Sequence, residues 1–162
     1  FITVYSEPGR GSSFKIHLPV KSGKCAEKAE PAAIDEELPT GNGETILLVD
    51  DEPLVLETTA RFLTKLGYEV LCKTSAVEAL QAVRETDIQI DLLITDVVMP
   101  DMNGRELACA VGNLRPDIKC LFMSGYTGEV LAEFGVTEKT EAFLQKPFTR
   151  TDLAQKIRSS LE

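Results

Sequence analysis

The sequence predicts an α/β protein: a doubly wound, five-stranded parallel sheet of order 2-1-3-4-5, preceded by an N-terminal β-hairpin fragment. Two observations lead to this prediction. From Thr45 onward, short apolar runs of strand length alternate five times with segments of helical periodicity, which is typical of a parallel sheet covered by helices on both faces. The first eighteen residues instead alternate apolar and polar side chains around a turn that contains Pro and Gly.

The hairpin is predicted from Phe1–Ser6 and Ser13–Leu18, which flank the turn residues Glu7–Gly11. An isolated hairpin is marginally stable in water, so we expect its sheet to lie upstream, in a longer protein of which this chain is a piece. The residues that follow are rich in Lys, Glu, Ala, Pro and Gly, which favours a flexible linker. We therefore expect three parts: a hairpin over 1–20, a linker over 21–43 and an α/β domain over 44–162.

The first half of the domain is expected to supply two strands and two helices. Ile46–Val49 is predicted to be a buried strand, and the helix that follows has Pro53 in its first turn and ends at Gly67. Glu69–Lys73 is predicted to be the second strand, and Ser75–Glu78 a capping box that opens the second helix. The buried helix faces are expected to be Leu56, Ala60 and Leu63, then Ala79, Leu80 and Val83.

The second half of the domain is expected to supply three more strands and three more helices. The predicted strands are Leu92–Thr95, Ile118–Met123 and Ala142–Gln145. One helix is expected after Gly104, with Leu107, Val111 and Leu114 facing the core. A short helix is expected around Val130–Phe134, ending at Gly135. The last helix is expected to begin at a Thr149 cap with Asp152 and to bury Leu153, Ile157 and Leu161. Right-handed crossovers make the flavodoxin-like order 2-1-3-4-5 the leading topology.

Composition excludes several classes of function. The chain has 162 residues and a formal net charge of −9, and residues 44–162 hold twelve basic and twenty acidic side chains. This acidity argues against nucleic-acid binding and against contact with an anionic membrane. No apolar run approaches the roughly 18 residues of a membrane span, so we expect a cytoplasmic fragment, whether or not its parent protein is membrane-attached. The four cysteines lack a CxxC spacing and are expected to be mostly buried thiols.

Acidic side chains stand where the predicted strands end. Asp50 and Asp51 follow the first strand and Asp96 follows the third, while Ser124 and Lys146 come after the fourth and fifth. Function gathers at the carboxyl ends of such strands. Two carboxylates about 4 Å apart repel by about 4 kcal/mol at an effective dielectric near 20, so either raised pKa values or a divalent cation such as Mg²⁺ must offset the repulsion. Together these groups suit phosphoryl transfer to an aspartate.

The motifs around these residues resemble the receiver domain of two-component response regulators. The resemblance covers residues 45–161 and rests on Leu48–Glu52, Leu93–Asp96, Met99–Gly104, Met123–Gly125 and Phe143–Phe148. It implies that Asp96 is the phosphoacceptor and that Asp51 binds Mg²⁺ directly, Asp50 mainly through water, with the Val98 carbonyl completing a protein ligand set that includes Asp96. The resemblance also implies that the domain catalyses its own phosphorylation and dephosphorylation.

The same resemblance assigns three further roles. Lys146 would contact the phosphoryl group, and Ser124 would rotate toward it. Phe143 occupies the place of the family's switch aromatic, although an ordinary core phenylalanine is an equally good interpretation. A Phe at this position lacks the hydroxyl of Tyr, so no output can depend on a hydrogen bond from its ring. The implied partner is a phosphohistidine-bearing kinase or a histidine phosphotransfer domain.

The N-terminal residues Tyr5–Phe14 and Leu18-Pro19 resemble the last hairpin of a histidine-kinase ATP-binding domain. A hairpin, a linker and a receiver in this order would form the end of a hybrid sensor histidine kinase. The ATP-binding boxes of that family are absent, so this fragment is not expected to be a kinase by itself. His17 is predicted to be an ordinary strand residue and not a phosphodonor.

Two rival functions remain open from the sequence. A Mg²⁺-dependent phosphohydrolase with an aspartyl nucleophile would carry a second Asp two residues after a nucleophile on the first strand, where this chain has Glu52. A flavodoxin-type binding module would need a Gly-, Ser- or Thr-rich phosphate loop, whereas Asp50–Pro53 repels phosphate. The output of a receiver is also open: it could pass its phosphoryl group onward or tune the attached kinase.

Overall fold

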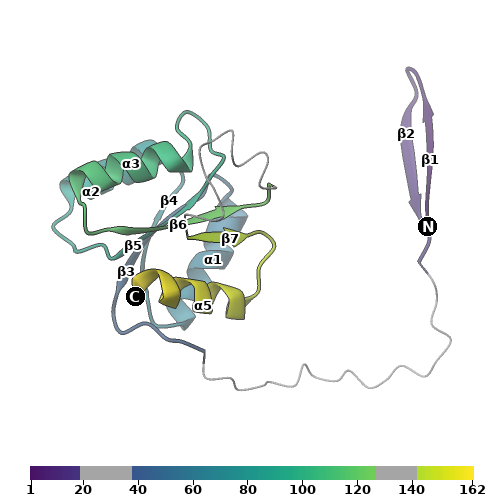
Figure 1. The fold of residues 1–162 in the computed structure, drawn as a ribbon. Helices are drawn as coiled ribbons and strands as arrows, with labels where there is room; N and C mark the ends of the chain where they lie inside the picture. The colour runs from purple at the N-terminus through teal and green to yellow at the C-terminus, as the bar shows by residue number, and fades with distance from the viewer. Residues whose placement is uncertain (19–37, 127–141) are drawn as a thin grey trace. The chain divides into compact units, whose positions relative to one another are not determined.

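The computed structural model describes residues 1–18, 38–126 and 142–162 (Figure 1). The chain divides into two compact units, residues 1–36 and 37–162. The expected helix around residues 130–134 lies outside the described residues. In the described ranges, no helix is both long enough and apolar enough to cross a membrane.

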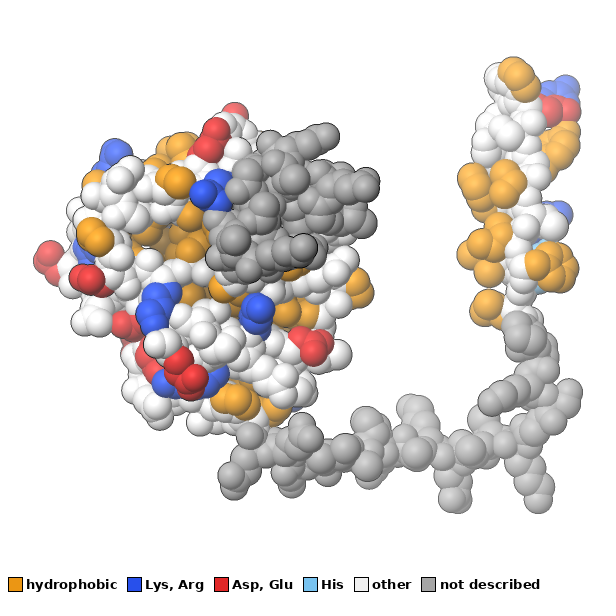
Figure 2. Space-filling view, in the orientation of Figure 1, with side chains coloured by type: hydrophobic (Ala, Val, Ile, Leu, Met, Phe, Trp, Pro, Cys, Tyr) orange, Lys and Arg blue, Asp and Glu red, His pale blue; other side chains and the backbone are white. Residues whose placement is uncertain are grey.

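The first unit is the predicted antiparallel hairpin, made of β1 (Ile2–Glu7) and β2 (Gly11–Ile16). Its register places Ile2 opposite Ile16 and Val4 opposite Phe14. Since alternate residues of a strand share a face, these four side chains form one apolar face. Each of them is at least 59% exposed within this chain, as the orange side chains on the hairpin in Figure 2 illustrate. The hairpin alone therefore leaves its apolar face uncovered.

The second unit contains the predicted parallel sheet. Its strands are β3 (Thr45–Val49), β4 (Glu69–Lys73), β5 (Leu92–Asp96), β6 (Lys119–Ser124) and β7 (Phe143–Gln145). They lie in the order β4-β3-β5-β6-β7, which confirms the predicted 2-1-3-4-5 topology. The chain reverses its direction of winding between β3 and β5, so the carboxyl ends of these strands form the expected site for function.

Helices cover both faces of the sheet (Figure 1). One face carries α1 (Pro53–Lys65) and α5 (Arg150–Leu161), and the other carries α2 (Ala76–Glu85) and α3 (Gly104–Leu114). Alternate residues of β3 divide between the two layers: Ile46 and Leu48 pack with α1 and α5, while Leu47 and Val49 pack with α2 and α3. This double burial explains why the strands are continuous apolar runs.

Some local predictions are wrong. Ser75 accepts a hydrogen bond from the Glu78 N–H, but the Glu78 carboxylate accepts from Thr74 instead of completing the expected box. Leu114 is 44% exposed because it lies in the last turn of α3, where the helix ends. Cys72 and Cys109 are exposed although they lie in apolar stretches, because apolar neighbours do not show which way a side chain points.

The second unit also includes residues that were expected to belong to the linker. Leu38 packs against the core under α1 and α5. The Gly41 N–H donates to the Leu66 carbonyl at 2.7 Å. Glu44, the first residue expected in the domain, accepts a hydrogen bond from Arg158 of α5 at 3.0 Å. The segment that enters the sheet is therefore fixed to α1 and α5.

Candidate functional site

Three carboxylates meet at the carboxyl ends of β3 and β5. Asp50 and Asp51 follow β3, and Asp96 is the last residue of β5. The parallel register of β3 and β5 pairs the residue before Asp50 with the residue before Asp96. One carboxylate oxygen from each aspartate lies within 4.8 Å of the others, so the predicted acidic cluster is present. Asp50 is fully buried.

Lys146 places a single ammonium between two of these carboxylates. Its Nζ lies 2.7 Å from Oδ2 of Asp50 and 3.2 Å from Oδ1 of Asp96. The Lys146 backbone N–H donates to the Ser124 carbonyl at 2.8 Å, which fixes the loop after β7 to the end of β6. The loop continues through a cis peptide bond to Pro147. Lys146 therefore belongs to the site, as the sequence predicts, although it lies fifty residues after Asp96 in the sequence.

Burial and charge shift the pKa values of this cluster. Burial raises the pKa of Asp96 to about 6, which the ammonium of Lys146 only partly opposes and the charge of Asp50 reinforces. Burial by itself lowers the pKa of Lys146, but its hydrogen bond to Asp50 and the charges of Asp96 and Asp50 outweigh burial and raise it. The lysine therefore stays positively charged, while Asp96 holds its proton more tightly than an exposed aspartate.

Two neighbours that the sequence analysis did not assign to the site position Asp96. The Thr95 hydroxyl donates to the Asp96 carbonyl at 2.9 Å. Gly104, the first residue of α3, approaches so closely that a Cβ there would lie 2.1 Å from the same carbonyl oxygen. The sequence indicates only that a helix starts at this point. In the structure, Asn103 and Glu106 form a capping box there. The close approach itself depends on how α3 packs on β5.

Ser124, Phe143 and Val98 lie on neighbouring elements. Ser124 is buried at the end of β6, and its Oγ accepts a hydrogen bond from the Tyr126 N–H at 3.1 Å. Phe143 is half-buried and, like Val98, packs against the small apolar cluster centred on Val97 and Phe122. Their positions are compatible with the predicted roles, but the roles themselves stay predictions.

Comparison with known proteins identifies the family. Residues 46–158 match the response regulator receiver domain family. This chain belongs to that family. The receiver fold and the receiver function expected from the sequence are therefore confirmed.

The most informative relatives include a kinase and a single-domain regulator. Sensor kinase CckA from Brucella abortus (strain 2308) is 36% identical to all of this chain, which spans 18% of that protein's length. The response regulator receiver protein CpdR from the same organism is 32% identical over 72% of this chain and 95% of its own length. Because the match to CckA covers the whole of this chain, it includes the hairpin as well as the receiver.

Solved structures of receiver domains have the same fold as this chain. The receiver domain of the hybrid histidine kinase CckA matches with a TM-score of 0.60 and 36% identity, covering 73% of this chain and 99% of that one. A response regulator receiver domain protein from Clostridium thermocellum matches with a TM-score of 0.64 and 28% identity, covering 73% of this chain and 94% of that one. Receivers in two-component systems accept phosphoryl groups from histidine kinases or phosphotransfer proteins, and they generally bind Mg²⁺.

The close contact at Gly104 leads to a first testable prediction. Gly104→Ala should lower the free energy of unfolding by about 1–3 kcal/mol, because the new methyl group must push α3 away from the end of β5. Gly112→Ala on the same helix meets no atom within 4 Å and should instead stabilise by about 0.5–1 kcal/mol. Urea unfolding measures both changes. Equal effects of the two substitutions would contradict the packing described.

The raised pKa of Asp96 leads to a second prediction, for metal-free protein. Between about pH 4 and pH 6 the folded chain holds a proton that the unfolded chain has lost, so the free energy of unfolding falls as pH rises through this window. Asp96→Asn removes the carboxyl whose ionisation lowers the free energy of unfolding, so it should stabilise the protein by about 1–3 kcal/mol at neutral pH. Urea unfolding in chelator across this pH range tests it, with the exposed Asp117→Asn as the control. A destabilised Asp96→Asn protein would contradict the assignment.

Proposed function

We propose that this chain is the receiver end of a hybrid sensor histidine kinase and that Asp96 accepts a phosphoryl group from phosphohistidine. The observation that carries the proposal is the convergence of three carboxylates within 4.8 Å beside one partly buried ammonium. Phosphoryl transfer needs a positioned oxygen nucleophile and positive charge beside it. Asp96 provides the first and Lys146 the second.

In the proposed reaction, a carboxylate oxygen of Asp96 attacks the phosphorus of phosphohistidine. The new O–P bond forms as the N–P bond breaks, and the leaving imidazole takes up a proton. Lys146 lies 3.2 Å from Asp96 and can bind an oxygen of the transferred group. The acyl phosphate brings a charge of roughly −1.5 to −2 into the pocket, so the lysine becomes more important after transfer than before.

We assign Mg²⁺ to the same cluster, with Asp51, Asp50, Asp96 and the carbonyl of Val98 as the protein ligands. An all-oxygen donor set suits this hard cation, and one oxygen from each aspartate is near enough to the others to share an ion. When bound, Mg²⁺ supplies charge neutralisation at the transferring phosphoryl oxygens. Asp50 is also held by Lys146, which fits an indirect role for this carboxylate.

We further propose that phosphorylation is sensed through Ser124 and Phe143. The Ser124 hydroxyl, now bonded to the Tyr126 N–H, would rotate to donate to the phosphoryl group. That change would free the Tyr126 N–H and alter the packing of Phe143 against Phe122. Because Phe143 has no hydroxyl, its part in the switch rests on packing alone.

The partner is proposed to dock in an apolar groove that reaches the lysine of the site. This docking groove, of about 500 Å³, is lined by Leu54, Val55, Thr58, Thr59, Phe62, Lys146, Pro147 and Phe148. Leu54 is 76% exposed and adjoins the other apolar side chains of the groove, and a contiguous exposed apolar surface of this kind is typical of an interface. A helix that carries phosphohistidine and an apolar face would fill the groove and bring its imidazole toward Asp96.

The hairpin is proposed to be the end of the kinase's ATP-binding domain. Its uncovered apolar face, made of Ile2, Ile16, Val4 and Phe14, supports packing against further kinase structure. The match of CckA over the whole chain supports the same arrangement. The fragment would be cytoplasmic and, with its net charge of −9, would act on proteins and not on nucleic acid or membrane surfaces.

A third prediction tests the nucleophile. The intact chain should take one equivalent of phosphoryl group from acetyl phosphate in a Mg²⁺-dependent manner, and Asp96→Asn should take none, whereas Asp117→Asn should behave as the unaltered chain. Intact-protein mass spectrometry measures the label. Labelled Asp96→Asn would refute the assignment. Steady turnover of a phosphoester would instead favour the phosphohydrolase alternative.

A fourth prediction tests the docking groove. Leu54→Asp should slow phosphoryl transfer from a phosphorylated histidine phosphotransfer domain roughly tenfold, because it places a charge in an apolar interface. Transfer from acetyl phosphate, which needs no groove, should be unchanged. Val77→Asp alters an apolar residue of α2 that is 59% exposed and serves as the matched control. If both variants slow the protein donor equally, docking lies elsewhere.

A further inference from the structure

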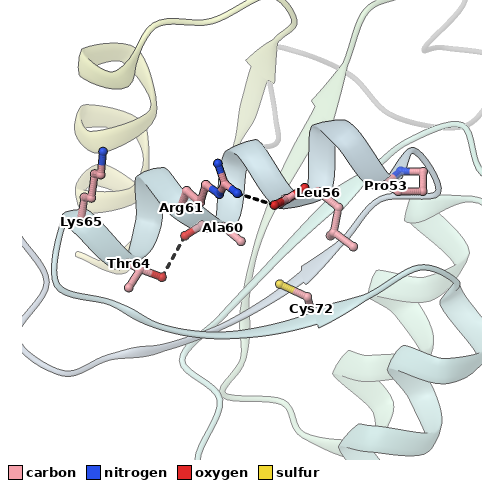
Figure 3. Close-up of a pocket in the computed structure, with 8 residues that line it drawn as sticks. Pro53, Leu56, Ala60, Arg61, Thr64, Lys65 and Cys72 are labelled. Carbon is pink, nitrogen blue, oxygen red and sulfur yellow. Dashed lines mark hydrogen bonds and ion pairs between the residues drawn. The ribbon is translucent and has the colours of Figure 1, made fainter.

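A second groove runs along the opposite side of α1, between this helix and β4 (Figure 3). This α1–β4 groove has a volume of about 540 Å³. Its floor is apolar and contains Leu56, Ala60 and Cys72, and its rim carries Glu57, Arg61 and Lys65. It shares no residue with the docking groove described above, so α1 has two distinct apolar surfaces.

The floor of this groove borders an open sheet edge. β4 pairs with β3 and ends the strand order of the described sheet, so its outer side presents backbone donors and acceptors that no strand there satisfies. Its sequence, Glu69–Lys73, has no Pro or Gly, but it is short and carries a charge at each end, so a strand that pairs with it must match those charges. The Cys72 side chain is exposed and points toward α1 (Figure 3). An unpaired strand edge therefore adjoins an unfilled apolar groove.

We propose that this edge binds a second copy of the same chain, through antiparallel pairing of β4 with the partner's β4. The charge pattern of the strand carries the choice of partner. A two-fold axis at Leu71 places Glu69 opposite the partner's Lys73, and Lys73 opposite the partner's Glu69. It also places Val70 opposite the partner's Cys72. The strand is thus complementary to itself, with two opposite-charge pairs around an apolar centre.

The groove is filled in the same arrangement. An axis perpendicular to the sheet keeps both α1 helices on one face, and each α1 packs over its own β3 and β4. The two helices would then lie about two strand spacings apart, or about 10 Å, which is the distance of directly packed helices. The small side chain of Ala60 would let the two helices approach closely at the middle of the contact. Lys65 is the last residue of α1, whereas Glu57 lies in its second turn and already pairs with Arg61 at 2.6 Å, so the helix contact rests on the apolar floor of the groove.

This dimer is compatible with the proposed receiver function and does not depend on it. The docking groove on the other side of α1 and the Asp96 cluster at the strand ends contribute no residue to the pairing. The paired strands are only five residues long, so the association should be weak and concentration-dependent.

Sedimentation velocity of the whole chain from micromolar to near-millimolar concentration tests the proposal. The average mass should rise from that of one chain toward that of two. Glu69→Lys and Lys73→Glu each create two like-charge pairs across the axis and should each weaken dimerisation roughly tenfold. The double variant Glu69→Lys, Lys73→Glu restores unlike pairs and should restore the affinity. Circular dichroism verifies that all variants are folded.

The double variant distinguishes this interface from other routes to association. A chain that keeps the mass of a monomer at every concentration would overturn the proposal. Single variants that dimerise as tightly as the unaltered chain, or a double variant that stays as weak as the single ones, would also overturn it. Either of these results would assign any association to another surface, such as the apolar face of the hairpin.

Discussion

The site depends on one ammonium shared by a fully buried carboxylate and a partly buried one. Lys146 contacts both Asp50 and Asp96, and Asp51 adds a third negative charge nearby. When all three aspartates are ionised, one positive charge cannot neutralise them, and burial makes the imbalance costly. The raised pKa of Asp96 expresses this cost. The same imbalance would favour a divalent cation in the pocket. The proposed metal binding and phosphoryl transfer would therefore depend on the same excess of negative charge as the raised pKa of Asp96.

The fold maintains this unfavourable arrangement by packing around it. Parallel pairing of β3 with β5 brings Asp50 and Asp96 to adjacent strand ends, and the buried strands leave little freedom for either backbone. Gly104 lets α3 press against the end of β5, while the backbone bond from Lys146 to Ser124 fixes the lysine's loop. The ends of β3 and β5 that carry the aspartates cannot move apart without disrupting the sheet. Stability stored in the apolar core thus offsets the electrostatic strain of the site.

Much of this arrangement was predictable because it follows from periodicity and topology. Apolar runs define the strands, and the carboxyl ends of parallel strands converge, so Asp50, Asp51, Asp96 and Lys146 could be grouped from their positions alone. What the sequence did not reveal depends on three-dimensional contacts. The close approach of Gly104 to Asp96 requires the docking of α3, and the exposure of Cys72 depends on the groove that α1 leaves over β4. Leu114 followed the helical pattern but lies in the terminal turn of α3.

The most direct test of the central claim is the protonation of Asp96 itself. Carboxyl-labelled aspartate can be followed by ¹³C NMR as metal-free protein is titrated, with Asp96→Asn used to assign the signal. Asp96 should titrate near pH 6, and Asp50→Asn should lower its pKa, because a neighbouring negative charge is removed. Titration of Asp96 near its ordinary value of 3.8, unchanged by Asp50→Asn, would show that the carboxylates do not share an electrostatic imbalance and would contradict the mechanism built on it.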